Sequence, residues 1–191
     1  MTAQRLERAA LSYLERYATN RVHLARLLTR RIALSVRRHG PEATSAGPEE
    51  VEALLDRLQR AGLLDDEAYA EGQARSLQRR GLSLAGIRSR LGQRGLSGEA
   101  IEQGVQQLIE EVPAPDLAAA VAFARRRRLG PYRPRDQRDA NRQRDLAALA
   151  RRAFPLGLAR TVVDAEDPDA LERLLEEAAD DRGGTAPGAY G

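Results

Sequence analysis

Three consecutive helix starts in the middle of the chain share one construction, and this repetition constrains the fold more than any other feature. Each start has an apolar residue, then a polar residue that can cap a helix, then a second apolar residue five positions after the first. The three sets are Leu64-Asp65 with Tyr69, Leu82-Ser83 with Ile87, and Leu96-Ser97 with Ile101. Such sets are hydrophobic staples around an N-cap. The pattern therefore predicts helices near 65–80, 83–94 and 97–111, joined by very short turns.

The remainder of the chain also shows helical spacing of apolar residues and no alternation typical of strands. Aromatic residues make up only 4% of the sequence, so aliphatic side chains must build the core, which favours helices. Further helices are expected around 11–14, 24–38, 48–61, 116–129, 135–154 and 156–165, with Asp116 as the cap of the fourth of these and one more short helix after Asp167-Pro168.

An internal repeat groups these helices. Arg94-Gly95-Leu96, with apolar residues before and after it, can be shifted onto Arg152-Ala153-Phe154. The predicted fold class is therefore all-α, a tandem array of three three-helix repeats. The expected boundaries are 1–62, 63–112 and 113–179. A disordered tail is expected at 180–191, where Gly, Ala and Pro dominate.

Residue types that many enzymes need are missing. The chain has no cysteine, and none of its 31 basic residues is a lysine, which excludes thiol chemistry, Schiff bases and a Walker-type lysine. The two histidines, His23 and His39, lie far from the Asp65-Asp66 pair in sequence, so neither a metal site nor an acid-base pair is expected there. We therefore expect a protein that is not an enzyme and uses no cofactor or metal.

No segment approaches the roughly 20 apolar residues that span a bilayer. The N-terminus carries charged residues with no apolar run behind them, unlike a signal peptide. We expect a cytoplasmic protein without membrane contact.

Positive charge is concentrated in separate segments, although the formal net charge is only +3. In each expected repeat the second helix is basic and the third is acidic, and residues 97–111 contain four glutamates and no arginine. A helix-turn-helix transcriptional regulator would place that acidic helix against phosphates, so this alternative is the weaker one. A binder that meets DNA through sequence-independent arginine contacts stays open. The candidate binding residues are Arg75, Arg79, Arg80, Arg88, Arg90, Arg94, Arg125 and Arg128.

The last two candidates belong to a run of four arginines, Arg125 to Arg128, of which only the first and last share a helix face. One interpretation is a solvated helix end that is favoured by the helix dipole. The other is contact with phosphates or with acidic residues of a partner.

The most specific segment lies between the first two expected repeats and continues through the second. It comprises Gly62-Leu63-Leu64-Asp65-Asp66, Tyr69-Ala70, Arg75-Ser76, Arg80-Gly81, Ile87-Arg88, Leu91 and Arg94-Gly95-Leu96. This segment resembles the signature of the RecX family, and the resemblance covers about residues 9–165. It implies a monomeric regulatory protein that binds RecA and its single-stranded DNA filament. Such a protein modulates, and most often inhibits, the recombinase in DNA repair, recombination and the SOS response.

Some features depart from the family pattern. Arginine stands where relatives usually have lysine, the loop from Gly40 to Gly47 is long, and the motif of the third repeat is eroded. The signature residues Gly62, Leu63, Leu64, Asp65, Asp66 and Tyr69 also have a purely structural interpretation, because the first aspartate can cap a helix that the apolar residues staple. We assign them a structural role.

Overall fold

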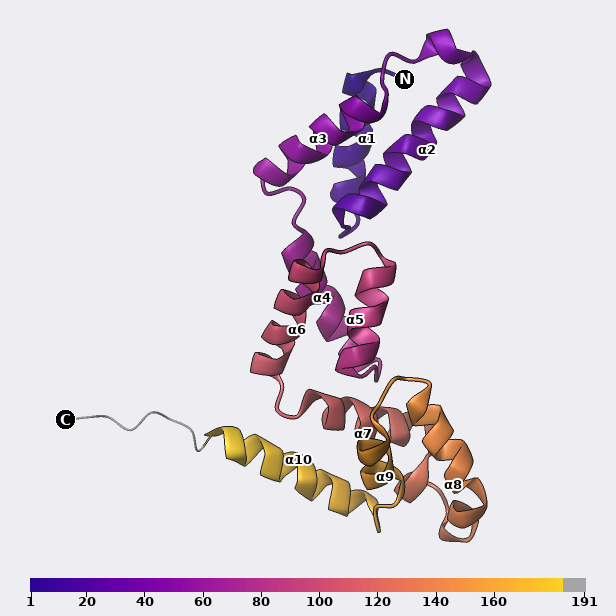
Figure 1. Cartoon of the computed structure of the whole chain (residues 1–191), viewed down its shortest axis with the longest axis vertical. Coiled ribbons are helices and arrows are strands. Elements are labelled where there is room, and N and C mark those ends of the chain that lie inside the picture. Colours follow the sequence, from indigo (N-terminus) through magenta and orange to yellow (C-terminus); the bar gives the residue numbers. More distant parts are fainter. Residues whose placement is uncertain (184–191) are drawn as a thin grey trace, which may run out of the picture. The chain divides into compact units, whose positions relative to one another are not determined.

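The protein is helical throughout the part of the chain that the structure describes, residues 1–183. Within those residues the computed structural model has ten α-helices, two short 3-10 helices and no strand (Figure 1). The predicted all-α fold class is confirmed.

The helices follow one another along the chain as three triplets and one further helix. The first triplet is α1 (Ala3–Leu14), α2 (Arg21–His39) and α3 (Pro48–Arg60), with the 3-10 turn η1 (Pro41–Ala43) after α2. The second is α4 (Asp66–Arg79), α5 (Leu84–Gln93) and α6 (Gly98–Glu111). The third is α7 (Pro115–Arg127), α8 (Arg135–Ala150) and α9 (Leu156–Val163), with η2 (Gly130–Tyr132) after α7 and with α10 (Pro168–Gly183) at the end.

The three predicted caps of the middle triplet are confirmed. The side chains of Asp65, Ser83 and Ser97 each accept a hydrogen bond from the backbone amide three residues later, at 2.9, 3.0 and 3.2 Å. These bonds satisfy amides that have no partner inside the helix, and so they set where each helix begins.

The chain divides into two compact units. The first comprises residues 1–70 and 91–101. Its core lies among α1, α2 and α3, which Figure 1 shows as one bundle, and α3 contributes apolar residues three and four positions apart. The buried residues are Leu6, Ala10, Leu24, Leu28, Ala46, Val51, Leu54, Leu55, Leu58 and Leu64.

The second unit comprises residues 71–90 together with residue 102 onward. Its largest core lies among α7, α8 and α9, and α10 closes it because Leu171 is fully buried there. The other buried residues are Ala119, Ala120, Val121, Phe123, Ala124, Leu129, Leu146, Leu149, Phe154, Ala159, Val162 and Val163.

The internal repeat seen in the sequence has a structural counterpart. Gly95 and Ala153 both have positive φ, +83° and +61°. Each lies at the end of the short turn that follows its helix, α5 or α8. In both places the next amide, that of Leu96 or Phe154, bonds to the carbonyl five residues earlier. This is a Schellman-type helix end. The left-handed position favours glycine, and Ala153 holds it without that advantage.

The C-terminal tail begins later than predicted. Residues 180–183 belong to α10 rather than to a disordered tail, because no glycine or proline interrupts the chain between Pro168 and Gly183. The rest of the predicted tail, 184–191, lies outside the described residues.

One buried charge organises the third triplet. The Asp145 carboxylate is 1% exposed, accepts a hydrogen bond from the Gly130 amide at 2.9 Å, and pairs with the Arg133 guanidinium at 2.8 Å. It thereby fastens η2 to α8, and its negative charge raises the pKa of Arg133. A buried carboxylate is tolerated only with such partners.

We expect Asp145→Ala to destabilise the protein by about 3 kcal/mol, because the half-buried Arg133 guanidinium and the buried Gly130 amide would lose their acceptor. Asp139→Ala, at an exposed position of the same helix, is the matched control and should change stability little. Urea unfolding of both variants measures the difference. Equal stability of the two would contradict this account of Asp145.

Candidate functional site

The N-terminus of α2 is closed by residues from the following triplet. Asn20 is fully buried; its side-chain oxygen accepts from the His23 amide at 2.8 Å, and its side-chain nitrogen donates to the Arg94 carbonyl at 3.1 Å. The Asp66 carboxylate accepts from the Arg21 amide at 2.7 Å. These contacts are called the first joint below. Asn20 satisfies one of the first amides of α2 from its own triplet, and Asp66 satisfies another from the next triplet.

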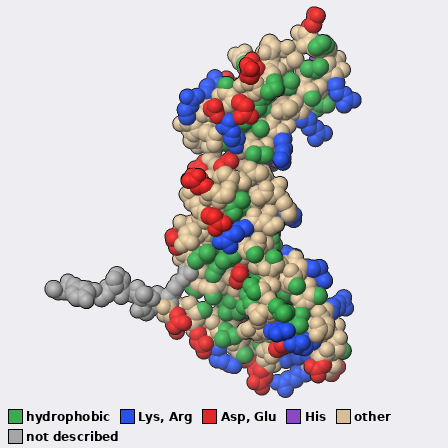
Figure 2. Space-filling view, in the orientation of Figure 1, with side chains coloured by type: hydrophobic (Ala, Val, Ile, Leu, Met, Phe, Trp, Pro, Cys, Tyr) green, Lys and Arg blue, Asp and Glu red, His purple; other side chains and the backbone are tan. Residues whose placement is uncertain are grey.

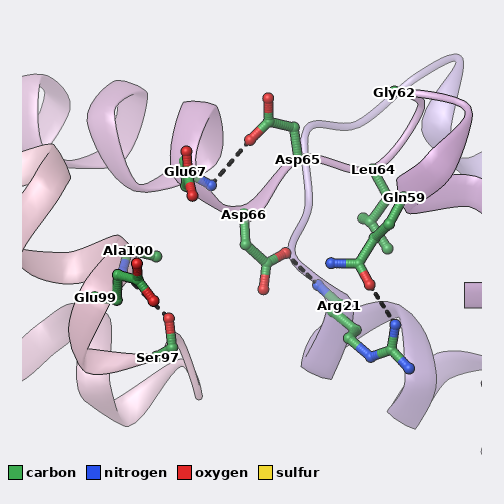
Figure 3. Close-up of a pocket in the computed structure, with 10 residues that line it drawn as sticks. All are labelled: Arg21, Gln59, Gly62, Leu64, Asp65, Asp66, Glu67, Ser97, Glu99 and Ala100. Carbon is green, nitrogen blue, oxygen red and sulfur yellow. Dashed lines mark hydrogen bonds between the residues drawn. The ribbon is translucent and has the colours of Figure 1, made fainter. Parts of the chain in front are cut away.

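Four residues of the predicted structural signature, Gly62, Leu64, Asp65 and Asp66, line the pocket beside Arg21 that Figure 3 shows. Gly62 has φ +68° where α3 ends, and Leu64 is buried in the core of the first unit. Asp65 caps α4, whereas the neighbouring Asp66 points to α2, so the two aspartates serve different helices. Leu63, in contrast, is 54% exposed.

The N-terminus of α5 is closed in the same way. The Ser83 hydroxyl donates to the carbonyls of Arg152 and Ala153 at 3.0 and 2.8 Å, and the Asp116 carboxylate accepts from the Leu84 amide at 2.6 Å. These contacts form the second joint. The prediction that Asp116 caps its own helix is wrong: α7 starts at Pro115, which has no amide hydrogen to satisfy, and the carboxylate instead binds an amide of α5.

The two joints use equivalent parts. In each, the N-cap residue of a second helix donates to the carbonyl of the arginine that follows the second helix of the next triplet, and an aspartate of the next first helix binds the adjoining amide. The first joint lies wholly within the first unit and the second wholly within the second. Arginines that flank the joints are therefore held in defined places.

Two of the predicted binding arginines form ion pairs with the acidic helix α6. Arg75 binds Glu111 through two hydrogen bonds of 2.6 Å, and Arg88 binds Glu102 at 2.8 and 3.0 Å. Hydrogen bonding to Arg75 lowers the pKa of Glu111 to about 2, and the bond from Arg88 lowers the pKa of Glu102 as well. The glutamates that neutralise these two arginines therefore lie on another helix, remote from them in the sequence.

The other candidates of the middle triplet have different surroundings. Arg94 donates from its guanidinium to the Tyr69 hydroxyl at 2.8 Å, next to the first joint. Arg90 is exposed on α5. Arg79 and Arg80 are exposed at the end of α4.

The structure brings Arg79 and Arg80 together with Arg126 and Arg152, and these four residues are called the arginine cluster. The Arg126 guanidinium donates to the Arg79 carbonyl at 3.2 Å, and that of Arg152 donates to the Arg80 carbonyl at 3.4 Å. The Arg152 guanidinium also lies 4.7 Å from the centre of the Phe123 ring. None of the four has a carboxylate partner among residues 1–183.

A glycine keeps this cluster compact. Gly81 has φ +75°, and a Cβ there would come within 2.8 Å of the Phe123 side chain and 2.9 Å of the Arg126 guanidinium. The turn after α4 therefore lies directly against α7. Arg126 and Arg152 were absent from the predicted binding residues, although the internal repeat makes Arg152 equivalent to Arg94, which was among them.

The four arginines at the end of α7, Arg125 to Arg128, have different surroundings. Arg125 pairs with Glu172 of α10, which favours the structural interpretation for that residue. Arg128 is exposed, and its φ of +52° ends the helix. Its role in binding stays a prediction.

Two kinds of site are not found in the part of the chain that the structure describes. No group of three or more histidine, cysteine, aspartate or glutamate side chains there is arranged to hold a metal ion. No helix there is both long and apolar enough to cross a membrane.

The Arg75–Glu111 pair predicts a titration. Because the folded pKa of Glu111 lies below the usual value of 4.5, its contribution to stability is present above that value and is lost as the pH falls towards about 2. Arg75→Gln should raise the pKa of Glu111 back towards its usual value. Carbon-13 NMR of the carboxyl group across acidic pH measures this, and an unchanged pKa in the variant would exclude the pair.

Comparison with known proteins agrees with this architecture. Residues 65–105 match the family model described as RecX, second three-helix domain. A solved structure described as the crystal structure of regulatory protein RecX aligns with 85% of this chain and 72% of its own, with a TM-score of 0.62 and 21% identity. At that identity the likeness concerns the fold alone.

Relatives with closer sequences extend over most of the chain. The regulatory protein RecX of Myxococcus xanthus is 45% identical over 160 residues, which cover 83% of this chain and 84% of the relative. The regulatory protein RecX of Halorhodospira halophila is 34% identical over 161 residues, which cover 84% and 88% of the two chains. The chain therefore belongs to the RecX family of regulatory proteins.

Proposed function

We propose that this protein is a non-enzymatic, cytoplasmic regulator that binds the recombinase RecA on its single-stranded DNA filament, as a monomer, and limits filament activity in recombination, DNA repair and the SOS response. The arginine cluster at the second joint is the observation that carries the proposal. It brings four arginine residues together on a chain of the RecX family, and none of the four has a carboxylate partner in the described residues.

The cluster suits the two kinds of surface that a nucleoprotein filament offers. The DNA offers phosphates and the protein offers carboxylates. A guanidinium can bind either anion through two hydrogen bonds. The backbone bonds from Arg126 and Arg152 fix two of these groups against the turn after α4. Less side-chain freedom is then lost on binding.

The ion pairs of α6 argue against a helix-turn-helix reader of DNA sequence. Its Glu102 and Glu111 are already bound to Arg88 and Arg75, and Glu99 and Glu110 add further negative charge to the same helix. Inserted in a major groove, α6 would carry four carboxylates towards phosphates. Filament regulation is therefore the better supported function.

The double variant Arg79→Ala/Arg80→Ala tests the proposal. Only backbone atoms of these two residues are hydrogen-bonded in the described structure, so alanine keeps those contacts and the fold should be unaffected. We expect about tenfold weaker inhibition of RecA filament growth on single-stranded DNA, measured by fluorescence of labelled filaments. If both residues contact phosphates, the salt slope of log K for bare single-stranded DNA should fall by about 1.4.

The matched control is Arg135→Ala/Arg144→Ala, which removes the same charge from exposed positions of α8 in the same unit. Weaker filament inhibition with unchanged binding to bare DNA would indicate that the cluster contacts acidic residues of RecA. Unchanged inhibition, or an equal loss in the control, would contradict the assignment of this surface.

A further inference from the structure

A polar pocket of about 400 Å³ opens beside the first joint, within the first unit. Residues from α1, from the α1–α2 turn, from α2, from α4 and from the end of α5 line it, and no carboxylate is among them. The lining side chains that the argument uses are Tyr13, Thr19, His23, Arg26, Tyr69 and Arg94. The charge of this pocket is therefore positive, unlike that of the pocket in Figure 3, which holds Asp65, Asp66, Glu67 and Glu99.

One buried hydroxyl in this pocket lacks a partner. Thr19 is only 6% exposed, and its Oγ1 has no hydrogen bond to any residue that the structure describes. The neighbouring Asn20 is fully bonded, so the unpaired group belongs to Thr19 alone. A buried hydroxyl without a partner costs stability. Thr19 lines the pocket, so a rotation about its Cα–Cβ bond would turn the hydroxyl towards a ligand that supplies the missing bond.

Aromatic rings lie in the wall of the pocket and beside it, because Tyr13 and His23 line the pocket and Tyr17 adjoins Tyr13. The Tyr13 ring is 5.0 Å from that of Tyr17 and 6.0 Å from that of His23, and its hydroxyl is 3.1 Å from the His23 Nε2. Tyr17 is 53% exposed, with the Arg16 guanidinium 5.8 Å from its ring centre. An exposed aromatic ring beside guanidinium groups provides a surface on which a nucleobase can stack.

A basic track leads away from the pocket along α2. Arg26, Arg30 and Arg37 fall on one face of the helix at 100° per residue, and all three are exposed. None of them has an ionic partner among residues 1–183, and α2 contains no acidic residue. Basic side chains follow the edge of the first bundle where α2 lies (Figure 2).

We propose that this pocket binds one nucleotide of single-stranded DNA. The base stacks on the ring of Tyr17 beside Tyr13, the phosphate lies between Arg26 and the Arg94 side that faces the pocket, and a polar atom of the nucleotide bonds to the Thr19 hydroxyl. The flanking phosphates then follow Arg30 and Arg37. A duplex keeps its bases stacked inside, so only an unpaired strand can use both the ring and the guanidinium groups.

The combination of features favours DNA over an acidic peptide. A peptide carboxylate would use the arginines but would leave the exposed tyrosine without a role. A nucleotide uses both, and successive phosphates match a row of arginines along a helix. The inference rests on the proposed function for its choice of single-stranded DNA, but its test needs no RecA, so the two can fail separately.

The test compares three variants with wild type in fluorescence anisotropy with a short oligothymidylate, its abasic counterpart, a duplex and oligoglutamate. Tyr17→Ala should weaken oligothymidylate binding about tenfold and leave abasic binding nearly unchanged, because only the stacked base is lost. Arg26→Ala should weaken both and lower the salt slope of log K by about 0.7. Thr19→Val, of nearly equal volume, should weaken oligothymidylate binding while the melting temperature stays equal or rises.

Arg8→Ala is the control, since Arg8 is an exposed arginine of α1 outside the pocket with no ion pair in the described residues. The proposal is overturned if wild type does not bind oligothymidylate, if it binds the duplex or oligoglutamate equally well, or if all variants behave like this control. In any of these cases the inhibition of RecA filaments by the arginine cluster remains separately measurable.

Discussion

The joints between consecutive triplets depend on one arrangement of hydrogen bonds at the N-terminus of a second helix. Its first amides bind its own N-cap side chain and an aspartate of the next triplet, and the N-cap side chain donates to a carbonyl of that triplet. Asn20 with Asp66, and Ser83 with Asp116, are the two occurrences. Unpaired amides at a buried helix end are costly, so each joint stabilises the helix ends that meet in it. Short triplets with small cores can thereby form larger cooperative units.

These joints also decide which arginines are available for binding. Arg75 and Arg88 are held by glutamates of α6, whereas the turn after α4, pressed against α7 at the second joint, brings Arg79 and Arg80 beside Arg126 and Arg152. The arginine cluster lies at the second joint, and the pocket proposed to bind a nucleotide lies beside the first. The basic segments of the sequence thus supply both the internal ion pairs and the arginines that we propose as a binding surface.

Local signals explain why much of the fold could be predicted. The caps at Asp65, Ser83 and Ser97 act within one turn of the chain, so their helices were placed to within one residue at each end. The same local logic failed at Asp116. The Asp116 carboxylate can accept a hydrogen bond from an amide of its own helix or from the distant Leu84 amide, and it binds the latter. The spacing of residues in the sequence does not reveal which of these amides lies nearer. The predicted tail began at residue 180, but α10 continues to Gly183, so the amino-acid composition did not mark where the helix ends.

The sequence by itself determined the helical fold, the triplet order, the positions of the caps and the absence of cysteine and lysine chemistry, because helix formation and residue identity are local properties. Only the tertiary structure decided that Glu111 neutralises Arg75, that Arg152 lies beside Arg80, and that Thr19 is buried without a partner. The physical reason is the range of the interactions. Ion pairs and buried hydroxyls depend on distances between residues far apart in the chain, and the folded packing alone sets those distances.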